Sequence, residues 1–187
     1  MPQDSPDAAF AVPLAEPYLQ QLTFQRYPEA ASIDGVRWQA LNKRRAENGF
    51  FMEYARLQQG ELEPFPGFTA RQISVSYAAP ERINAFHIHP REAQNELWTV
   101  IAGQLLVWLV DCRQHSPSQG VKRAFVLSGE APVQLYIPAG VAHGYRAGAQ
   151  GATLLYMMDK QFDLANPNEG RLPWDAFGAD LWQEDRG

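Results

Sequence analysis

Three of the four histidines in the chain lie in strand-like segments or their tight turns, with spacings that suit proton transfer or metal binding. His87 and His89 are separated by a single residue, and His143 follows a Pro-x-Gly turn. Side chains alternate along a strand, so residues at i and i+2 project from the same face. A carboxylate, Glu96, follows His89 by seven residues. We therefore expect three imidazoles and one carboxylate to meet in one pocket.

The residues around this group predict the β-strands that must position it. Expected strands cover residues 50–57, 71–77, 82–89, 96–101, 104–111, 123–127, 134–137 and 153–158. Ala102 and Gly103 predict a hairpin between two of them, and no amphipathic helix is expected before Leu164. Short strands at this density, without alternating helices, favour a sandwich or a barrel.

Length and composition indicate one soluble globular domain. The chain has 187 residues, of which 45% are hydrophobic and 20% charged. We expect residues 1–17, rich in Pro, Ala and Asp, to form a flexible lead-in and residues 18–187 to form a single domain. The net charge of −5 argues against a nucleic-acid partner, because no basic stripe is available for phosphates.

Compartment signals favour the cytoplasm. Cys112 is the only cysteine, so no intramolecular disulfide can form, as is usual in a reducing compartment. The N-terminus lacks the charged and apolar regions of a secretory signal. The longest apolar-rich run, residues 97–110, is too short to span a bilayer, so no membrane partner is expected.

Two further motifs resemble a known family. Residues 111–120 read Asp-Cys-Arg-Gln-His-Ser-Pro-Ser-Gln-Gly, and residues 137–145 read Ile-Pro-Ala-Gly-Val-Ala-His-Gly-Tyr. In this order they resemble the D-x-R-x-x-S-P-[TS]-x-G and L-x-I-P-x-G-x-A-H-G-F motifs of dTDP-4-dehydrorhamnose 3,5-epimerases, and the similarity extends over about residues 33–182. It implies an all-β fold, a double-stranded β-helix jelly roll (a cupin barrel) with short peripheral helices, and a homodimer.

The resemblance also implies a chemistry, proton transfer α to the 4-keto group of a sugar nucleotide without a cofactor. His87 matches the family's catalytic base and Tyr156 its proton donor. The resemblance also predicts substrate-binding residues. Glu53, Gln72 and His143 match positions where the family contacts its nucleotide sugar. Asn84 stands where the family has a diphosphate-binding arginine, and Ser74 lies on the same strand face as Gln72.

The chain departs from the family at charged positions. Asn48 and Asn84 replace arginines that grip the diphosphate, and Glu96 replaces the active-site lysine. The sequence as given ends five residues after Trp182, without the Lys-Asp segment whose aspartate orients the base in the family. Asp185 is a weak candidate for that role. These replacements predict a weaker attraction for a diphosphate, because asparagine offers no bidentate, charge-assisted hydrogen bond.

The same departures leave two alternatives open. His87, His89, Glu96 and His143 stand where metal-binding cupins place three histidines and a glutamate, a set that suits a divalent transition metal. The chain would then be a metal-dependent isomerase or dioxygenase, and His87 would be a ligand instead of a base. The other alternative is a non-catalytic cupin that binds a carbohydrate.

Overall fold

The structure, a computed structural model, describes residues 10–25 and 29–183. Contacts divide the chain into two units, and the larger spans Ala30–Glu184. The helix α1 (Glu16–Leu19) belongs to the other unit. The expected division after residue 17 stays a prediction. Among the described residues, no helix has the length and apolar character needed to cross a membrane.

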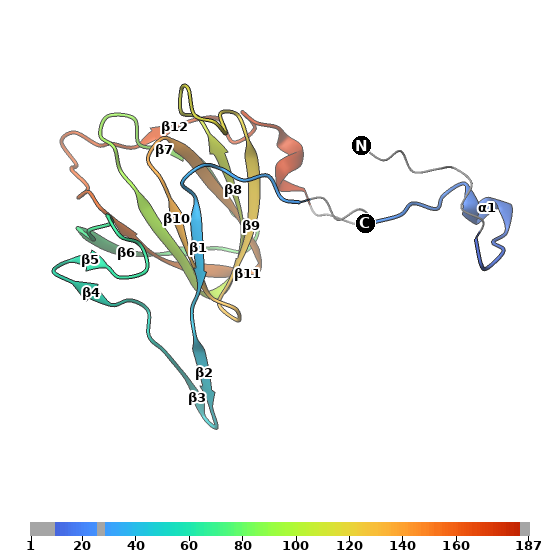
Figure 1. Cartoon of the computed structure of the whole chain (residues 1–187), viewed down its shortest axis with the longest axis horizontal. Helices are drawn as coiled ribbons and strands as arrows, with labels where there is room; N and C mark the ends of the chain where they lie inside the picture. The colour runs from blue at the N-terminus through green and yellow to red at the C-terminus, as the bar shows by residue number, and fades with distance from the viewer. Residues whose placement is uncertain (1–9, 26–28, 184–187) are drawn as a thin grey trace. The chain divides into compact units, whose positions relative to one another are not determined.

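The larger unit is a barrel of two antiparallel layers (Figure 1). Its strands are β1 (Arg37–Ala40), β6 (Gln72–Ala78), β7 (Ile83–Ile88), β8 (Glu96–Asp111), β9 (Lys122–Ser128), β10 (Val133–Ile137), β11 (Val141–Met158) and β12 (Gly170–Arg171). One layer has the order β1-β10-β8-β11-β6 and the other β9-β8-β11-β7-β12. This arrangement confirms the predicted all-β jelly roll.

The two long strands β8 and β11 belong to both layers, and here the prediction of a hairpin at Ala102-Gly103 is wrong. β8 continues through Gly103, which has φ +72°, and its register against β11 shifts there. A Cβ at Gly103 would lie 2.0 Å from the carbonyl oxygen of Gly151. Glycine permits this conformation and close approach, so the strand bends between layers instead of reversing.

Smaller elements flank the barrel. β2 (Lys43–Ala46) and β3 (Gly49–Met52) form a hairpin that projects from it, and β4 (Leu57–Gln58) pairs with β5 (Glu61–Leu62) (Figure 1). The strand expected over residues 50–57 therefore stops at Met52. Within the described part of the larger unit, helical structure is confined to the 3₁₀ turn η1 (Ala179–Trp182).

The space between the layers is filled by apolar side chains at one end and polar ones at the other. Fully buried core residues include Val100, Leu105, Val107, Leu109, Leu127 and Leu135. Burying each such side chain contributes roughly 1.5–3 kcal/mol, so this end of the barrel holds much of the core that stabilises the fold. A binding site can therefore form at the polar end of the barrel.

The first family motif builds a turn that supports this end. The buried carboxylate of Asp111 accepts hydrogen bonds from Arg113 Nε (2.8 Å) and Ser118 Oγ (2.6 Å). Arg113 in turn packs against Gly140, where a Cβ would lie 2.6 Å from its Cγ. The turn thereby fixes the start of β11, the strand that carries His143.

Candidate active site

One cavity of about 460 Å³ lies at the polar end of the barrel. Its walls come from β6, β7, β8, β11 and the segment before β12. Of the residues predicted from the sequence, those that line it are Gln72, Asn84, His87, His89, Glu96, His143 and Tyr156. Residues from both layers and from distant parts of the chain thus share one space.

His87, on β7, has a polar partner at each ring nitrogen. Nδ1 contacts a carboxylate oxygen of Glu169, and Nε2 lies 3.0 Å from Oδ1 of Asn84. The hydrogen bond from His87 lowers the pKa of Glu169, so this carboxylate is ionised and can only accept. Nδ1 of His87 therefore carries a proton. In the neutral ring the lone pair is then on Nε2, so the contact with Oδ1 of Asn84 is not a hydrogen bond in that state, and Nε2 can take a proton from a ligand.

Glu169 is a residue that the sequence analysis missed. It lies in an irregular segment between β11 and β12 and gives no strand or motif signal of its own. The pairing of β12 with β7, in which Gly170 lies opposite Ile88, brings it to the two histidines. A carboxylate beside His87 is thus supplied by a segment 82 residues further along the chain.

Tyr156 reaches the cavity from β11 and is half-buried. Burial is the largest influence on its hydroxyl and raises its pKa, while a hydrogen bond with Ser74 acts in the opposite direction. Ser74 also accepts a hydrogen bond of 3.1 Å from Gln72 Nε2. Tyr156 is therefore protonated at neutral pH and can act as an acid.

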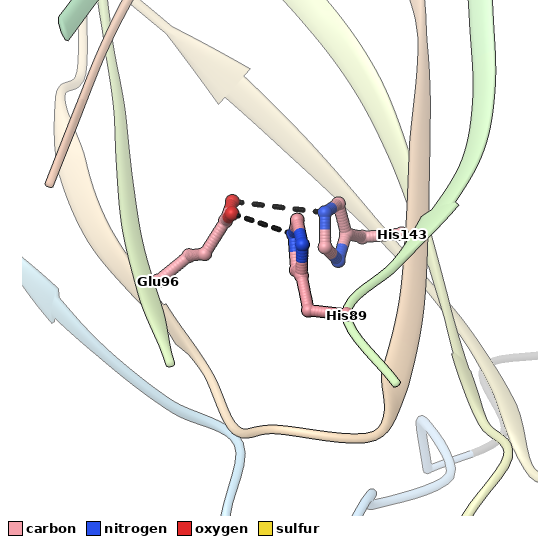
Figure 2. Close-up of side chains that lie close together, drawn as sticks. All are labelled: His89, Glu96 and His143. Atoms are coloured by element: carbon pink, nitrogen blue, oxygen red, sulfur yellow. Dashed lines mark ion pairs between the residues drawn. The ribbon is translucent and has the colours of Figure 1, made fainter. Parts of the chain in front are cut away.

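A second group of polar side chains is buried deeper in the same cavity (Figure 2). Nε2 of His89 lies 2.8 Å from Oε1 of Glu96, and Nε2 of His143 lies 3.6 Å from Oε2. Burial lowers the pKa of His143 to about 4, which leaves this ring neutral at pH 7. For His89, burial is opposed by the neighbouring Glu96 carboxylate, and the net effect raises its pKa.

Two arginines that the sequence analysis did not single out lie at this site. Arg82 lines the cavity, and Nη1 of Arg171 donates a hydrogen bond of 3.2 Å to Oδ1 of Asn84. Both arginines are exposed. They place positive charge close to Asn84, one of the two positions where this chain has asparagine and the resembled family has arginine.

Glu53 and Asn48 lie away from the cavity. Glu53 is exposed and accepts a hydrogen bond of 2.7 Å from Arg56 Nε, beside a separate surface groove. Asn48 occupies the turn between β2 and β3. Glu53 does not line the cavity formed by its own chain, so its expected contact with a substrate stays a prediction.

Comparison with known proteins agrees with this architecture. The sequence model of the dTDP-4-dehydrorhamnose 3,5-epimerase family matches residues 30–181. The spore coat polysaccharide biosynthesis protein SpsL of Bacillus subtilis is 38% identical over 144 residues, covering 76% of this chain and 91% of that protein.

Solved structures with the same fold include a dTDP sugar isomerase from Desulfovibrio desulfuricans (27% identity, TM-score 0.68, covering 80% of this chain and 92% of that chain). Another is a dTDP-6-deoxy-D-glucose-3,5-epimerase from Legionella pneumophila in complex with dTDP-4-keto-L-rhamnose (26% identity, TM-score 0.68, covering 79% and 78%). The match of the family model over most of the chain confirms the resemblance seen in the two motifs. The chain belongs to the dTDP-4-dehydrorhamnose 3,5-epimerase family.

Proposed function

We propose that the chain is an epimerase that inverts a carbon centre next to the 4-keto group of a dTDP-linked sugar. The observation that carries the proposal is the cavity itself. A histidine with a carboxylate on its Nδ1 and a protonated tyrosine, His87 and Tyr156, line the same space. Family membership supplies the reaction class, and the Legionella relative was solved with a sugar nucleotide of this kind.

In the proposed mechanism, His87 is the base. Its Nε2 takes the proton from the carbon α to the ketone, and the electrons of the broken C–H bond move onto the ketone oxygen to give an enolate. The ring becomes an imidazolium, which the Glu169 carboxylate stabilises through Nδ1. Tyr156 then gives its hydroxyl proton to the same carbon from the other face, and the centre is inverted. The proton transfers proposed here need no cofactor.

Substrate binding is assigned to the polar residues around this pair. Gln72, Asn84 and His143 line the cavity, and Ser74 lies behind Tyr156. We assign Arg82 and Arg171 to the diphosphate at the mouth, because guanidinium groups form charge-assisted hydrogen bonds with phosphate oxygens.

The alternative with four metal ligands is not favoured by this geometry. Nδ1 of His87 is engaged by Glu169. The residues whose donor atoms cluster are His89, Glu96 and His143, without His87. His87 is therefore assigned as base and not as ligand.

We also propose a cytoplasmic homodimer. Among the described residues, β6 pairs only with β11, and it presents Ile73, Val75 and Tyr77 outward, each more than half exposed. Apolar side chains in a row on an edge strand are typical of a protein interface. Glu53 can contact a substrate only if a second copy brings it to a cavity. Cytoplasmic location follows from the single cysteine and from the nucleotide sugar as substrate.

Solvent exchange tests the proposed function. The protein is incubated in D₂O with a dTDP-4-keto-6-deoxy sugar, and deuterium at C3 and C5 is followed by NMR. We expect wash-in at one or both positions, and loss of wash-in for His87→Asn. No exchange with any 4-keto sugar nucleotide, in protein shown to be folded by circular dichroism, would contradict the proposal.

A further inference from the structure

His89, Glu96 and His143 point donor atoms at one another in the interior of the barrel (Figure 2). One nitrogen or oxygen from each residue lies within 4.8 Å of the others. The exposed fractions of the three residues are 7%, 4% and 2%. We propose that these residues bind a divalent first-row transition metal ion.

The first argument concerns which ring nitrogens are free. Nδ1 of His89 lies 2.5 Å from the carbonyl oxygen of Asn168, and Nδ1 of His143 lies 3.1 Å from that of Val141. A carbonyl can only accept, so each Nδ1 carries hydrogen. In a neutral ring the lone pair is then on Nε2. Histidines that bind metals are oriented in this way, through a hydrogen bond from the other ring nitrogen.

The second argument is that both lone pairs face an anion. Nε2 of His89 and Nε2 of His143 lie 2.8 and 3.6 Å from the two oxygens of the Glu96 carboxylate. Despite its short distance, Nε2 of His89 is buried without a hydrogen-bond partner among the described residues. A proton on His89 would bridge only His89 and Glu96. A divalent ion among the three donor atoms would contact both rings and the carboxylate.

The third argument is that the carboxylate is held in place. Gln94 Nε2 donates to Oε1 of Glu96 at 2.9 Å, and Trp98 Nε1 donates to Oε2 at 2.6 Å. A carboxylate has about four acceptor positions, so these bonds leave capacity for a cation. Hydrogen bonds of this kind to a ligating carboxylate are typical of metal centres.

The donor set also defines the ion. Two imidazoles and one carboxylate suit Zn²⁺, Fe²⁺, Mn²⁺, Co²⁺ or Ni²⁺, and three protein ligands leave coordination positions open. Because all three residues line the cavity, the open positions face it. If the proposed function holds, such an ion would supply positive charge near the ketone oxygen, in the place of the lysine that Glu96 replaces.

Direct metal binding tests the site without substrate. Protein without a histidine tag is treated with EDTA, dialysed, and titrated with Co²⁺ and then Zn²⁺. We expect one Co²⁺ per chain with visible d–d absorption, which Zn²⁺ abolishes. Glu96→Gln, close in shape to the wild type, should weaken Co²⁺ binding by more than about 100-fold. His115→Ala, which removes an exposed histidine outside the cavity, should bind as the wild type does.

Circular dichroism confirms that Glu96→Gln is folded, and His89→Gln replaces it if it is not. No stoichiometric uptake by the wild type in excess Co²⁺, or equal affinity of the wild type and the ligand variant, would overturn the site. Deuterium exchange is measured on the same samples. Metal binding without deuterium exchange would support the metal site and count against the proposed epimerase activity. Deuterium exchange by protein that takes up no ion would support the epimerase activity and overturn the metal site.

Discussion

The Glu169 carboxylate accepts a hydrogen bond from Nδ1 of His87, although 82 residues separate them in the chain. This contact determines which nitrogen of His87 is available to a substrate. In the proposed reaction it also places a negative charge beside the ring that becomes positive during proton abstraction. The base of the proposed reaction is thus defined by two segments, the strand β7 and the irregular segment before β12.

Replacing Glu169 with Gln should reduce kcat by roughly 100-fold or more, since the base loses both its orientation and the charge that stabilises the imidazolium. Glu169→Asp should recover part of the rate. Steady-state kinetics from pH 5 to 9 measure both effects. Glu92→Gln is the control, an exposed glutamate paired with Lys160, and an equal loss in this variant would refute a positioning role.

Tyr156→Phe should separate the two proton transfers. Abstraction by His87 continues, so deuterium from the solvent still enters the substrate, whereas formation of the inverted sugar falls by roughly 10²–10⁴-fold. NMR in D₂O reports both quantities in one experiment. If exchange and inversion fall together, Tyr156 is not the proton donor on the second face.

Arg82→Gln and Arg171→Gln should raise KM for the sugar nucleotide about tenfold each and leave kcat nearly unchanged, because a charge-assisted hydrogen bond to phosphate is lost. The effect should shrink at high salt, where exposed charges are screened. Arg45→Gln serves as the control, since Arg45 lies on β2 and pairs with Glu130. Unchanged KM in both cavity variants would remove these arginines from the diphosphate site.

Asp111→Asn should destabilise the fold by about 3 kcal/mol, because Arg113 and two serine hydroxyls lose a buried anion. Hydrogen bonds from Arg113 are the largest cause of a strongly lowered pKa of Asp111. A lowered folded-state pKa contributes stability that is present above the unfolded value of about 3.9 and lost as the pH falls below it. Urea unfolding at pH 7 and pH 3 should therefore show a smaller acid-induced loss in the variant. An equal loss in both proteins would contradict this account.

Val75→Lys should shift the proposed dimer toward monomer, because it places a charge in the exposed apolar row of β6. Sedimentation velocity measures the change. Val126→Lys, on β9, alters a valine of equal exposure, 61%, and should leave the assembly unchanged. A wild-type protein that sediments as a monomer would refute the proposed dimer.

The sequence by itself determined the local structure and most of the candidate site. Period-two alternation predicted the strands, and the spacing of His87 and His89 predicted that both would face one side. Two motifs identified the family, since each depends on residues close together in the chain. In the Asp111 motif, the residues that bond the carboxylate lie within seven positions of it.

Only the tertiary structure decided the partners of those residues. Glu169 meets His87, and Arg171 meets Asn84, because β12 pairs with β7 in one register. Gly103 continues β8 instead of ending it, since β11 passes beside it at contact distance. Contacts across 80 or more residues depend on how strands pair, and strand pairing is set by packing of the whole barrel, which no local pattern encodes.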